Sequence, residues 1–122
     1  MENISVYDQM TRSEKEVAIF LKETGIFWSY EKPVYIWDEN DRPRVWTPDF
    51  CLVSFGIYVE VCGSEDFDYN YRKKTYRNNG YDVIFLHLYK DSFSWKKHFI
   101  RFLKMIMEYR AKNFDYVFKN IN

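Results

Sequence analysis

The chain has 122 residues, of which 21% are aromatic, and its formal net charge at neutral pH is zero. This length fits a single domain over residues 1–122, and four glycines and three prolines are too few for a disordered or fibrous chain. The two cysteines show no CxxC spacing, the N-terminus has no basic and apolar leader, and no apolar run approaches ~20 residues, so we expect an intracellular, cytoplasmic protein without a membrane partner.

The zero net charge hides a division along the chain. Residues 1–70 carry 6 Lys/Arg and 14 Asp/Glu, a net charge of −8, whereas residues 71–122 carry 12 and 4, a net charge of +8. A basic C-terminal half can follow a phosphate backbone while acidic residues of the other half hold a metal ion. The alternative is that the two halves pair their charges across the fold.

The first predicted helix spans roughly Ser13 to Thr24. Ser13 followed three residues later by Glu16 has the pattern of a capping box. Apolar residues then recur at helical spacing from Val17 until Gly25, which ends the run.

Strand-like segments follow this helix. Residues 26–37, IFWSYEKPVYIW, are rich in aromatic and β-branched side chains and end at the turn-forming DENDRP, which predicts a strand or an irregular hairpin arm. Residues 44–53 and 57–61 predict two further strands, joined as a hairpin by the short connection at residues 54–56.

The C-terminal half predicts a helix, a strand and a final helix. The second predicted helix of the chain covers residues 68–78 and stops at Asn79 and Gly80. The apolar run YDVIFLHL after it is short enough for a buried strand. The last helix begins at a capping Ser94. The order of helix, three strands, helix, strand and helix is typical of a mixed α/β sheet flanked by helices. One stripe of the final helix is apolar: Trp95, Phe99, Phe102, Leu103 and Ile106.

Each arm of the predicted hairpin carries one carboxylate. Asp49 and Glu60 differ by an odd number, so antiparallel pairing with an even-numbered connection puts them opposite each other on one face, whereas an odd connection needs a bulge. Like charges directly opposed destabilise a sheet, and a divalent cation would remove that cost. The alternative is that one carboxylate merely ends its strand and points to solvent.

Four segments around these carboxylates occur in a characteristic order: Ser13-x-x-Glu16, TPDF at residues 47–50, YVEVCG at 58–63 and YRKKTYRNNGYDVIFL at 71–86. In this order and spacing the chain resembles the PD-(D/E)XK, or restriction-endonuclease-like, nuclease superfamily over roughly residues 13–88. The resemblance implies a restriction-endonuclease-like αβββαβ core, with a mixed central sheet flanked by helices and an extra C-terminal helix.

The same resemblance implies a site and a reaction. Asp49 and Glu60 would bind a catalytic Mg²⁺, for which Mn²⁺ can substitute, with the Val61 carbonyl as a third ligand. Glu16 would approach this site from the first helix, although a capping role alone is equally open. The implied activity is that of a Mg²⁺-dependent endonuclease that hydrolyses phosphodiester bonds in DNA.

One position departs from the superfamily pattern. Cys62 stands where a lysine usually follows the second carboxylate, and a thiol cannot supply a fixed positive charge. Some members carry this lysine on the next helix, where Lys73 is our first candidate and Lys74 the second. The alternative is a catalytically inactive domain that binds nucleic acid or a protein partner.

Basic residues of the C-terminal half are the candidates for contacts with DNA. A double-strand cut needs two active sites, so we expect the domain to nick as a monomer or to cleave as a homodimer. No organic cofactor is expected. The predicted nucleic-acid-binding residues are Arg72, Lys74, Arg77, Lys96 and Lys97.

Overall fold

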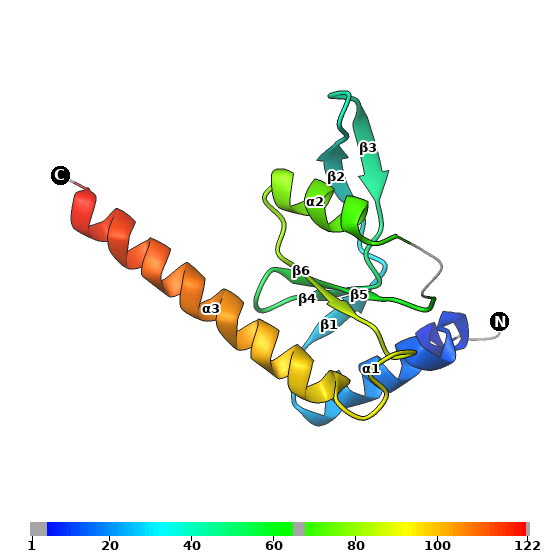
Figure 1. Cartoon of the computed structure of the whole chain (residues 1–122). Helices are drawn as coiled ribbons and strands as arrows, with labels where there is room; N and C mark the ends of the chain where they lie inside the picture. Colours follow the sequence, from blue (N-terminus) through cyan, green and yellow to red (C-terminus); the bar gives the residue numbers. More distant parts are fainter. Residues whose placement is uncertain (1–4, 65–67, 122) are drawn as a thin grey trace.

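The computed structural model describes residues 5–64 and 68–121. Residues 1–4, 65–67 and 122 lie outside the described residues, so the expectation of no N-terminal leader falls partly outside them. The described residues form a mixed α/β fold with three α-helices, a four-stranded mixed sheet and a separate two-stranded hairpin (Figure 1). The predicted fold class, a mixed sheet with flanking helices, is therefore confirmed.

The main sheet has the strand order β1-β4-β5-β6. β1 (Trp28–Tyr30), β4 (Phe50–Leu52) and β5 (Ile57–Val61) pair in antiparallel fashion, and β6 (Val83–Leu86) lies parallel to β5 at the sheet edge. The chain returns from β5 to β6 through α2 (Asn70–Asn78), because two parallel strands cannot be joined by a tight turn.

Helices cover both faces of this sheet (Figure 1). On one face, α1 (Arg12–Glu23) and α3 (Trp95–Asn120) pack against the apolar side chains of β4, β5 and β6. On the other face lie α2 and the hairpin of β2 (Val34–Trp37) and β3 (Pro43–Trp46). The larger core comprises Val17, Ala18, Leu21, Phe50, Leu52, Ile57, Val59, Ile84, Leu86, Trp95 and Phe99.

A smaller apolar cluster holds the hairpin to α2. Val34 and Ile36 of β2 pack on Tyr76, which is almost fully buried. The Asn79 side chain also accepts a hydrogen bond from the Trp37 backbone N–H at 2.7 Å and donates one to the Trp37 carbonyl at 3.0 Å. The hairpin is thus attached to the helix that runs beside the carboxylates of the main sheet.

The first helix begins earlier than predicted. Its N-cap is Thr11, whose hydroxyl accepts a hydrogen bond from the Glu14 N–H at 3.2 Å, while the Glu14 carboxylate accepts one from the Thr11 N–H at 2.9 Å. The capping box is therefore Thr11 and Glu14, and the prediction of Ser13 with Glu16 is wrong. Both pairs have the same sequence pattern, and the structure uses the earlier one.

Two predicted strands are each divided into two. Residues 26–37 break after Tyr30, where Glu31 has a φ of 55°, so β1 joins the main sheet and β2 joins the hairpin. Residues 44–53 break before Phe50, because Pro48 has no N–H to donate to a neighbouring strand. The chain consequently has five strands before α2 instead of three, with the β2–β3 hairpin inserted between β1 and β4.

The later helices agree better with prediction. α2 ends at Asn78, and Gly80 follows with a φ of 79°, as expected for a helix stop. α3 starts after Ser94, but the Ser94 hydroxyl donates to the Asp91 carboxylate at 3.2 Å and caps no helical N–H. One member of the predicted apolar stripe of this helix, Phe102, is not buried, because 44% of its surface is exposed.

None of the helices in the described part of the chain has the length and apolar character that crossing a bilayer requires.

Candidate active site

Asp49 and Glu60 lie opposite each other at one end of the β4–β5 pair. Phe50 pairs with Val59 and Leu52 with Ile57, so the next position along the ladder brings Asp49 beside Glu60. The connection between the paired ends contains four residues, an even number. The predicted connection of residues 54–56 is one residue too short, because β4 ends at Leu52 and not at Val53. Of the two cases that the sequence left open, the structure has the even-numbered one, and no bulge is needed to oppose the two carboxylates.

The Asp49 carboxylate is fixed by the backbone of β5. Its Oδ2 atom accepts a hydrogen bond from the Val61 N–H at 2.7 Å. Because the N–H and C=O of one strand residue point to the same edge of the strand, the Val61 carbonyl is also directed toward the Asp49 side. The Asp49 side chain is half-buried and hydrogen-bonded. The alternative that it merely ends its strand and faces solvent is therefore wrong for Asp49.

A third carboxylate reaches the same place from α1, and it belongs to Glu14. This residue is 7% exposed, and its Oε2 atom accepts a hydrogen bond from the Tyr30 hydroxyl at 3.0 Å. A cavity of about 450 Å³ is lined by Glu14 and its neighbours at the N-terminus of α1, and by Asp49, Val61 and Gly63 of the β4–β5 arms. The cavity opens where the end of the helix meets the β4–β5 ladder.

Glu16, the helical acid expected at this site, is exposed on α1 and does not line the cavity. The sequence does hold a signal for the correct residue. Glu14 precedes the buried residues Val17, Ala18 and Leu21 by three, four and seven positions, so it shares their face of the helix. Glu16 lies two positions further on and points to another side.

Burial and the negative charges of neighbouring acids disfavour ionisation of Asp49 and Glu60. Burial raises the pKa of Asp49 from 3.8 to about 7; the Val61 N–H opposes the rise, and the negative charges of Glu60 and Glu14 add to it. Burial also raises the pKa of Glu60, against the charge of Arg72 and the hydrogen bonds from Arg72 and Tyr76. Ionising both carboxylates is therefore unfavourable in the metal-free protein, and a bound cation would offset this cost.

Glu60 is held from α2 by two donors. Its Oε1 atom accepts hydrogen bonds from the Arg72 guanidinium and from the Tyr76 hydroxyl, each at 3.2 Å. The guanidinium also lies 4.7 Å from the ring centroid of Trp46, in a cation–π contact that joins the β2–β3 hairpin to the site. Arg72, expected to contact nucleic acid, is thus the ion-pair partner of one of the two opposed carboxylates.

Cys62 is buried, and its thiol is unreactive. Burial, followed by the negative charge of Glu60, raises the pKa of its thiol to about 12, so the thiol is protonated at neutral pH. It is neither a nucleophile nor a source of positive charge. Both cysteines of the chain, Cys51 and Cys62, are free, in agreement with the absence of a disulfide framework.

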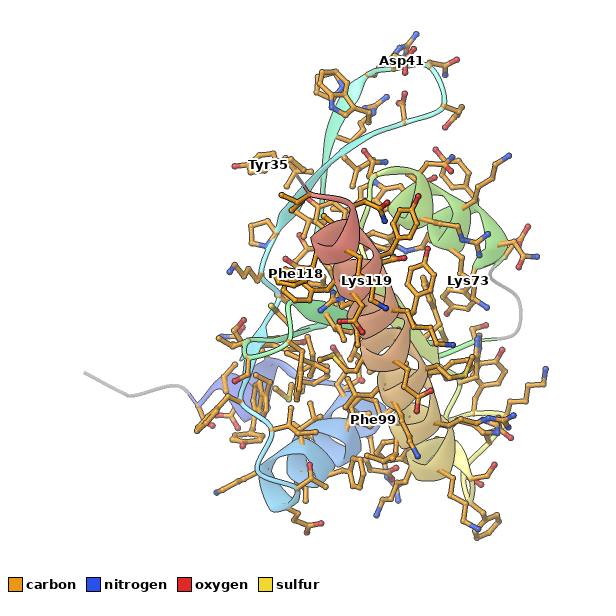
Figure 2. All side chains as sticks on the ribbon, turned by 90° about the vertical axis from the view of Figure 1, so that its left-hand side faces the viewer. Tyr35, Asp41, Lys73, Phe99, Phe118 and Lys119 are labelled. Atoms are coloured by element: carbon orange, nitrogen blue, oxygen red, sulfur yellow. The ribbon has the colours of Figure 1, made fainter. Side chains whose placement is uncertain are left out.

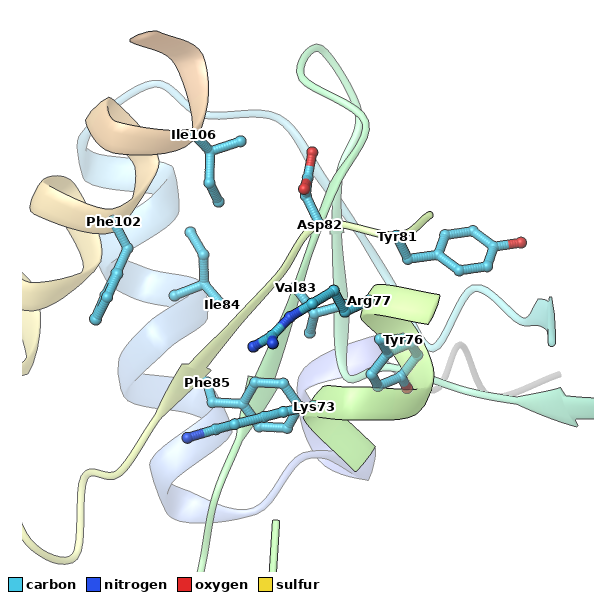
Figure 3. A pocket seen from close by; sticks show the side chains of 10 residues that line it. All are labelled: Lys73, Tyr76, Arg77, Tyr81, Asp82, Val83, Ile84, Phe85, Phe102 and Ile106. Atoms are coloured by element: carbon cyan, nitrogen blue, oxygen red, sulfur yellow. The ribbon is translucent and has the colours of Figure 1, made fainter. Parts of the chain in front are cut away.

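Lys73 makes no ion pair with Asp49 or Glu60 in the described part of the chain. Its ammonium lies 5.4 Å from the ring centroid of Phe85, and its side chain extends along that ring in Figure 3. The positive charge of Lys73 nevertheless acts to lower the pKa of Cys62. The ammonium is therefore close enough to act electrostatically on the position where the superfamily lysine would stand.

The remaining basic candidates do not share one surface. Lys74 and Arg77 are exposed on α2, where Arg77 joins Lys73 in lining a cavity of about 340 Å³ between α2, β6 and α3 (Figure 3). Lys96 and Lys97 are exposed at the start of α3, on the opposite face of the sheet, and the Lys96 ammonium lies 5.4 Å from the Phe20 ring centroid. The five predicted contacts are thus divided between two layers.

Among residues 5–64 and 68–121, no group of three or more His, Cys, Asp or Glu side chains is arranged to hold a metal ion. A cation at this site would accordingly depend on the two opposed carboxylates, a backbone carbonyl and water. This incomplete oxygen shell fits Mg²⁺, which keeps several water ligands when it binds to proteins.

Comparison with protein-family models, with curated proteins and with solved structures finds no match for this chain. The chemistry of the site is therefore inferred from its own residues.

Proposed function

We propose that this chain is a Mg²⁺-dependent endonuclease of the PD-(D/E)XK type that hydrolyses phosphodiester bonds in DNA. The observation that carries the proposal is the direct opposition of Asp49 and Glu60 at the end of an antiparallel ladder, with the pKa of Asp49 raised to about 7. Two opposed acids destabilise a sheet, and a cation bound between them would remove the part of this cost that the Arg72–Glu60 ion pair leaves at Asp49. The order of α1, β1, β4, β5, α2 and β6 also agrees with the αβββαβ core of that superfamily.

Each residue has a distinct role in this proposal. Asp49, Glu60 and the Val61 carbonyl hold the cation, and Arg72 keeps Glu60 ionised for that purpose. When bound, Mg²⁺ neutralises charge on the phosphate and lowers the pKa of the attacking water. Glu14 positions Asp49 from α1, and Lys73 supplies the positive charge that Cys62 cannot provide.

The proposal is tested by incubating supercoiled plasmid DNA with the purified chain in Mg²⁺, in Mn²⁺ and in EDTA. We expect nicked or linear product with either metal and none in EDTA. Calorimetric titration with Mn²⁺ gives a readout that does not depend on cleavage. An intact plasmid in all three conditions, together with no heat of Mn²⁺ binding, would show that the chain is not a metal-dependent nuclease.

We expect Glu14→Gln to lower kcat/KM by about tenfold or more, because residues that position metal ligands typically contribute 10- to 100-fold to activity. Glutamine preserves the capping box while removing the charge beside Asp49. Glu16→Gln on the same helix is the matched control and should retain wild-type activity. Plasmid cleavage by the two variants decides between the two acids, and a larger loss in Glu16→Gln would restore Glu16 as the site residue.

Lys73→Met should lower kcat about 100-fold, since the loss of one group that stabilises transition-state charge typically costs 10²- to 10³-fold. Lys74→Met is the neighbouring control, and it should raise KM and weaken the salt dependence while leaving kcat unchanged, because Lys74 is exposed on the outer side of α2. Single-turnover rates on a labelled duplex measure both. Full activity in both Lys73→Met and Lys74→Met would exclude a relocated lysine.

One observation favours a second function, a catalytically inactive domain that binds nucleic acid or protein. Arg72 and Tyr76 both donate to the same oxygen of Glu60, and this arrangement neutralises one carboxylate without a metal. Such a domain would bind DNA equally well with and without Mg²⁺. Gel-shift titrations in Mg²⁺ and in EDTA, run beside the cleavage assay, separate the two functions.

A further inference from the structure

The C-terminal half of α3 extends beyond the body of the protein. Its buried residues all lie between Trp95 and Leu103, and the Arg110 guanidinium then ties the helix to the Asp82 carboxylate, 2.8 Å away, and to carbonyl groups of the β4–β5 turn. Every residue from 111 to 121 is exposed. In Figure 1 this part of the helix projects away from the sheet, and Figure 2 shows Phe118 and Lys119 at its far end from Phe99.

The projecting segment carries an apolar row at the spacing of a helix–helix contact. We name this row the α3 seam. Its residues alternate by four and three positions, which is the a/d pattern of a two-helix interface. The rings of Phe114 and Phe118 stack with centroids 6.2 Å apart and planes inclined by 18°, and both side chains are 69% exposed. The α3 seam consists of Met107, Ala111, Phe114, Phe118 and Ile121.

We propose that the α3 seam is the interface of a homodimer, in which the projecting part of α3 packs against the same segment of a second copy. Taking roughly 200 Å² for each large side chain, the exposed parts of the seam and of the adjoining Val117 amount to about 600 Å² per chain. Two chains then bury about 1,200 Å², which is the lower end of the range for stable, specific interfaces. Aromatic residues at the centre of such an interface typically contribute most of the affinity.

The charges near the seam favour a second copy over other occupants. Glu108 and Asp115 are matched by Lys112 and Lys119, so the projecting segment carries equal numbers of free acidic and basic residues once Arg110 is paired with Asp82. Helices that lie on membranes or follow nucleic acid are expected to carry a surplus of basic residues. A balanced surface instead permits like segments to associate without net repulsion.

Lys104 occupies the next seam position toward the start of α3 and ends the apolar row there. The contact therefore runs from Met107 to Ile121 and leaves the packed part of the helix unchanged. Both copies use the same patch, so the dimer closes on itself and does not extend into a filament. This inference is independent of whether the carboxylate site is catalytic.

Sedimentation equilibrium or light scattering of the full chain at micromolar concentration tests the dimer. The wild type should have twice the monomer mass of 15.1 kDa. The variant Phe114→Glu/Phe118→Glu should raise the dissociation constant at least tenfold. The matched control is Tyr109→Glu/Tyr116→Glu, which makes the same charge change at side chains that are 66% and 70% exposed on the opposite side of the helix.

Circular dichroism establishes that each variant is folded, which is expected because all four substituted side chains are exposed. A second variant, Phe114→Ala/Phe118→Ala, removes the aromatic area without adding charge and should also dissociate. A monomeric wild type overturns the proposal, as does a dimer that both double glutamate variants weaken equally. Binding of a monomeric wild type to phosphatidylserine vesicles would likewise overturn it, since the seam would then contact lipid.

Discussion

Asp49→Asn is expected to abolish metal-dependent cleavage and at the same time to stabilise the metal-free protein at neutral pH. Loss of a carboxylate ligand removes several kcal/mol of transition-state stabilisation, so the cleavage rate should fall by about a thousandfold or more. Asparagine keeps the shape of the side chain and can still accept the hydrogen bond from the Val61 N–H. The variant therefore changes charge with little change in packing.

The stabilisation follows from the raised pKa of Asp49. Between pH 4 and about 7 the unfolded chain has released this proton while the folded chain still holds it, so the free energy of unfolding falls as the pH rises through this range. The full shift, from 3.8 to about 7, corresponds to at most about 4 kcal/mol. Asp49→Asn removes this dependence, because it has no proton to lose.

Urea unfolding of the metal-free wild type and of Asp49→Asn, at pH 5 and at pH 8, measures the effect. The variant should be more stable than the wild type at both pH values, and the difference should be clearly larger at pH 8 than at pH 5. Saturating Mg²⁺ should stabilise the wild type at pH 8 and leave the variant unchanged, because only the wild type has the ligand. Equal pH dependence in both proteins would mean that Asp49 is already ionised in the folded chain.

Arg72→Gln should destabilise the protein by about 3 kcal/mol at pH 8, since removing one partner of a buried ion pair leaves the other charge uncompensated. The side chains of Arg72 and Glu60 are only 23% and 10% exposed, so water screens the pair poorly. The substitution also removes the cation–π contact with Trp46. For a domain of this size, the expected fall in Tm is about 10 °C.

This loss should depend on pH in a defined direction. Without Arg72 the pKa of Glu60, already raised by burial, rises further, so the folded chain keeps its proton over a wider range. Stability is then highest at low pH and falls as the pH rises through the pKa of Glu60 in the folded state. The variant should consequently approach wild-type stability at pH 5.

A double-mutant cycle isolates the pair. Arg72→Gln/Glu60→Gln should recover much of the stability that Arg72→Gln loses, because no buried charge is left unpaired. Arg77→Gln, an exposed position on the same helix, is the control and should change the free energy of unfolding by less than about 0.5 kcal/mol. If the double variant is no more stable than Arg72→Gln, the loss comes from packing on Trp46 and not from the ion pair.

The sequence was sufficient for the hairpin and for the two carboxylates on its arms, and the structure decided the even-numbered connection that opposes them. Phe50, Leu52, Ile57 and Val59 alternate with polar or smaller residues, and each of the four is buried on one face. A shift of one residue would turn all of them to the other face, so the apolar pattern excludes such a shift, and the short connection excludes larger ones. Asp49 and Glu60 oppose each other because the connection contains four residues.

The sequence was less sufficient for the residues that surround the carboxylates. Two capping boxes overlap at the start of α1, and helical periodicity selects Glu14 only when its face is compared with that of Val17 and Leu21. On α2, Arg72, Lys73 and Lys74 are consecutive and point about 100° apart, so the one that meets Glu60 depends on how the helix crosses the sheet.

Local pattern determined this protein's helices, its buried strands and the pair of acids, because the alternation of apolar residues over a few positions is enough to define which face is buried. Only the tertiary structure decided the division of strands at Glu31 and Pro48, the burial of Glu14 and the pairing of Arg72 with Glu60. It also decided how far α3 projects, because Arg110 still binds Asp82 and the β4–β5 turn, whereas every residue from 111 to 121 is exposed. Each of these depends on contacts between segments that are distant in the chain, and their geometry is set by packing.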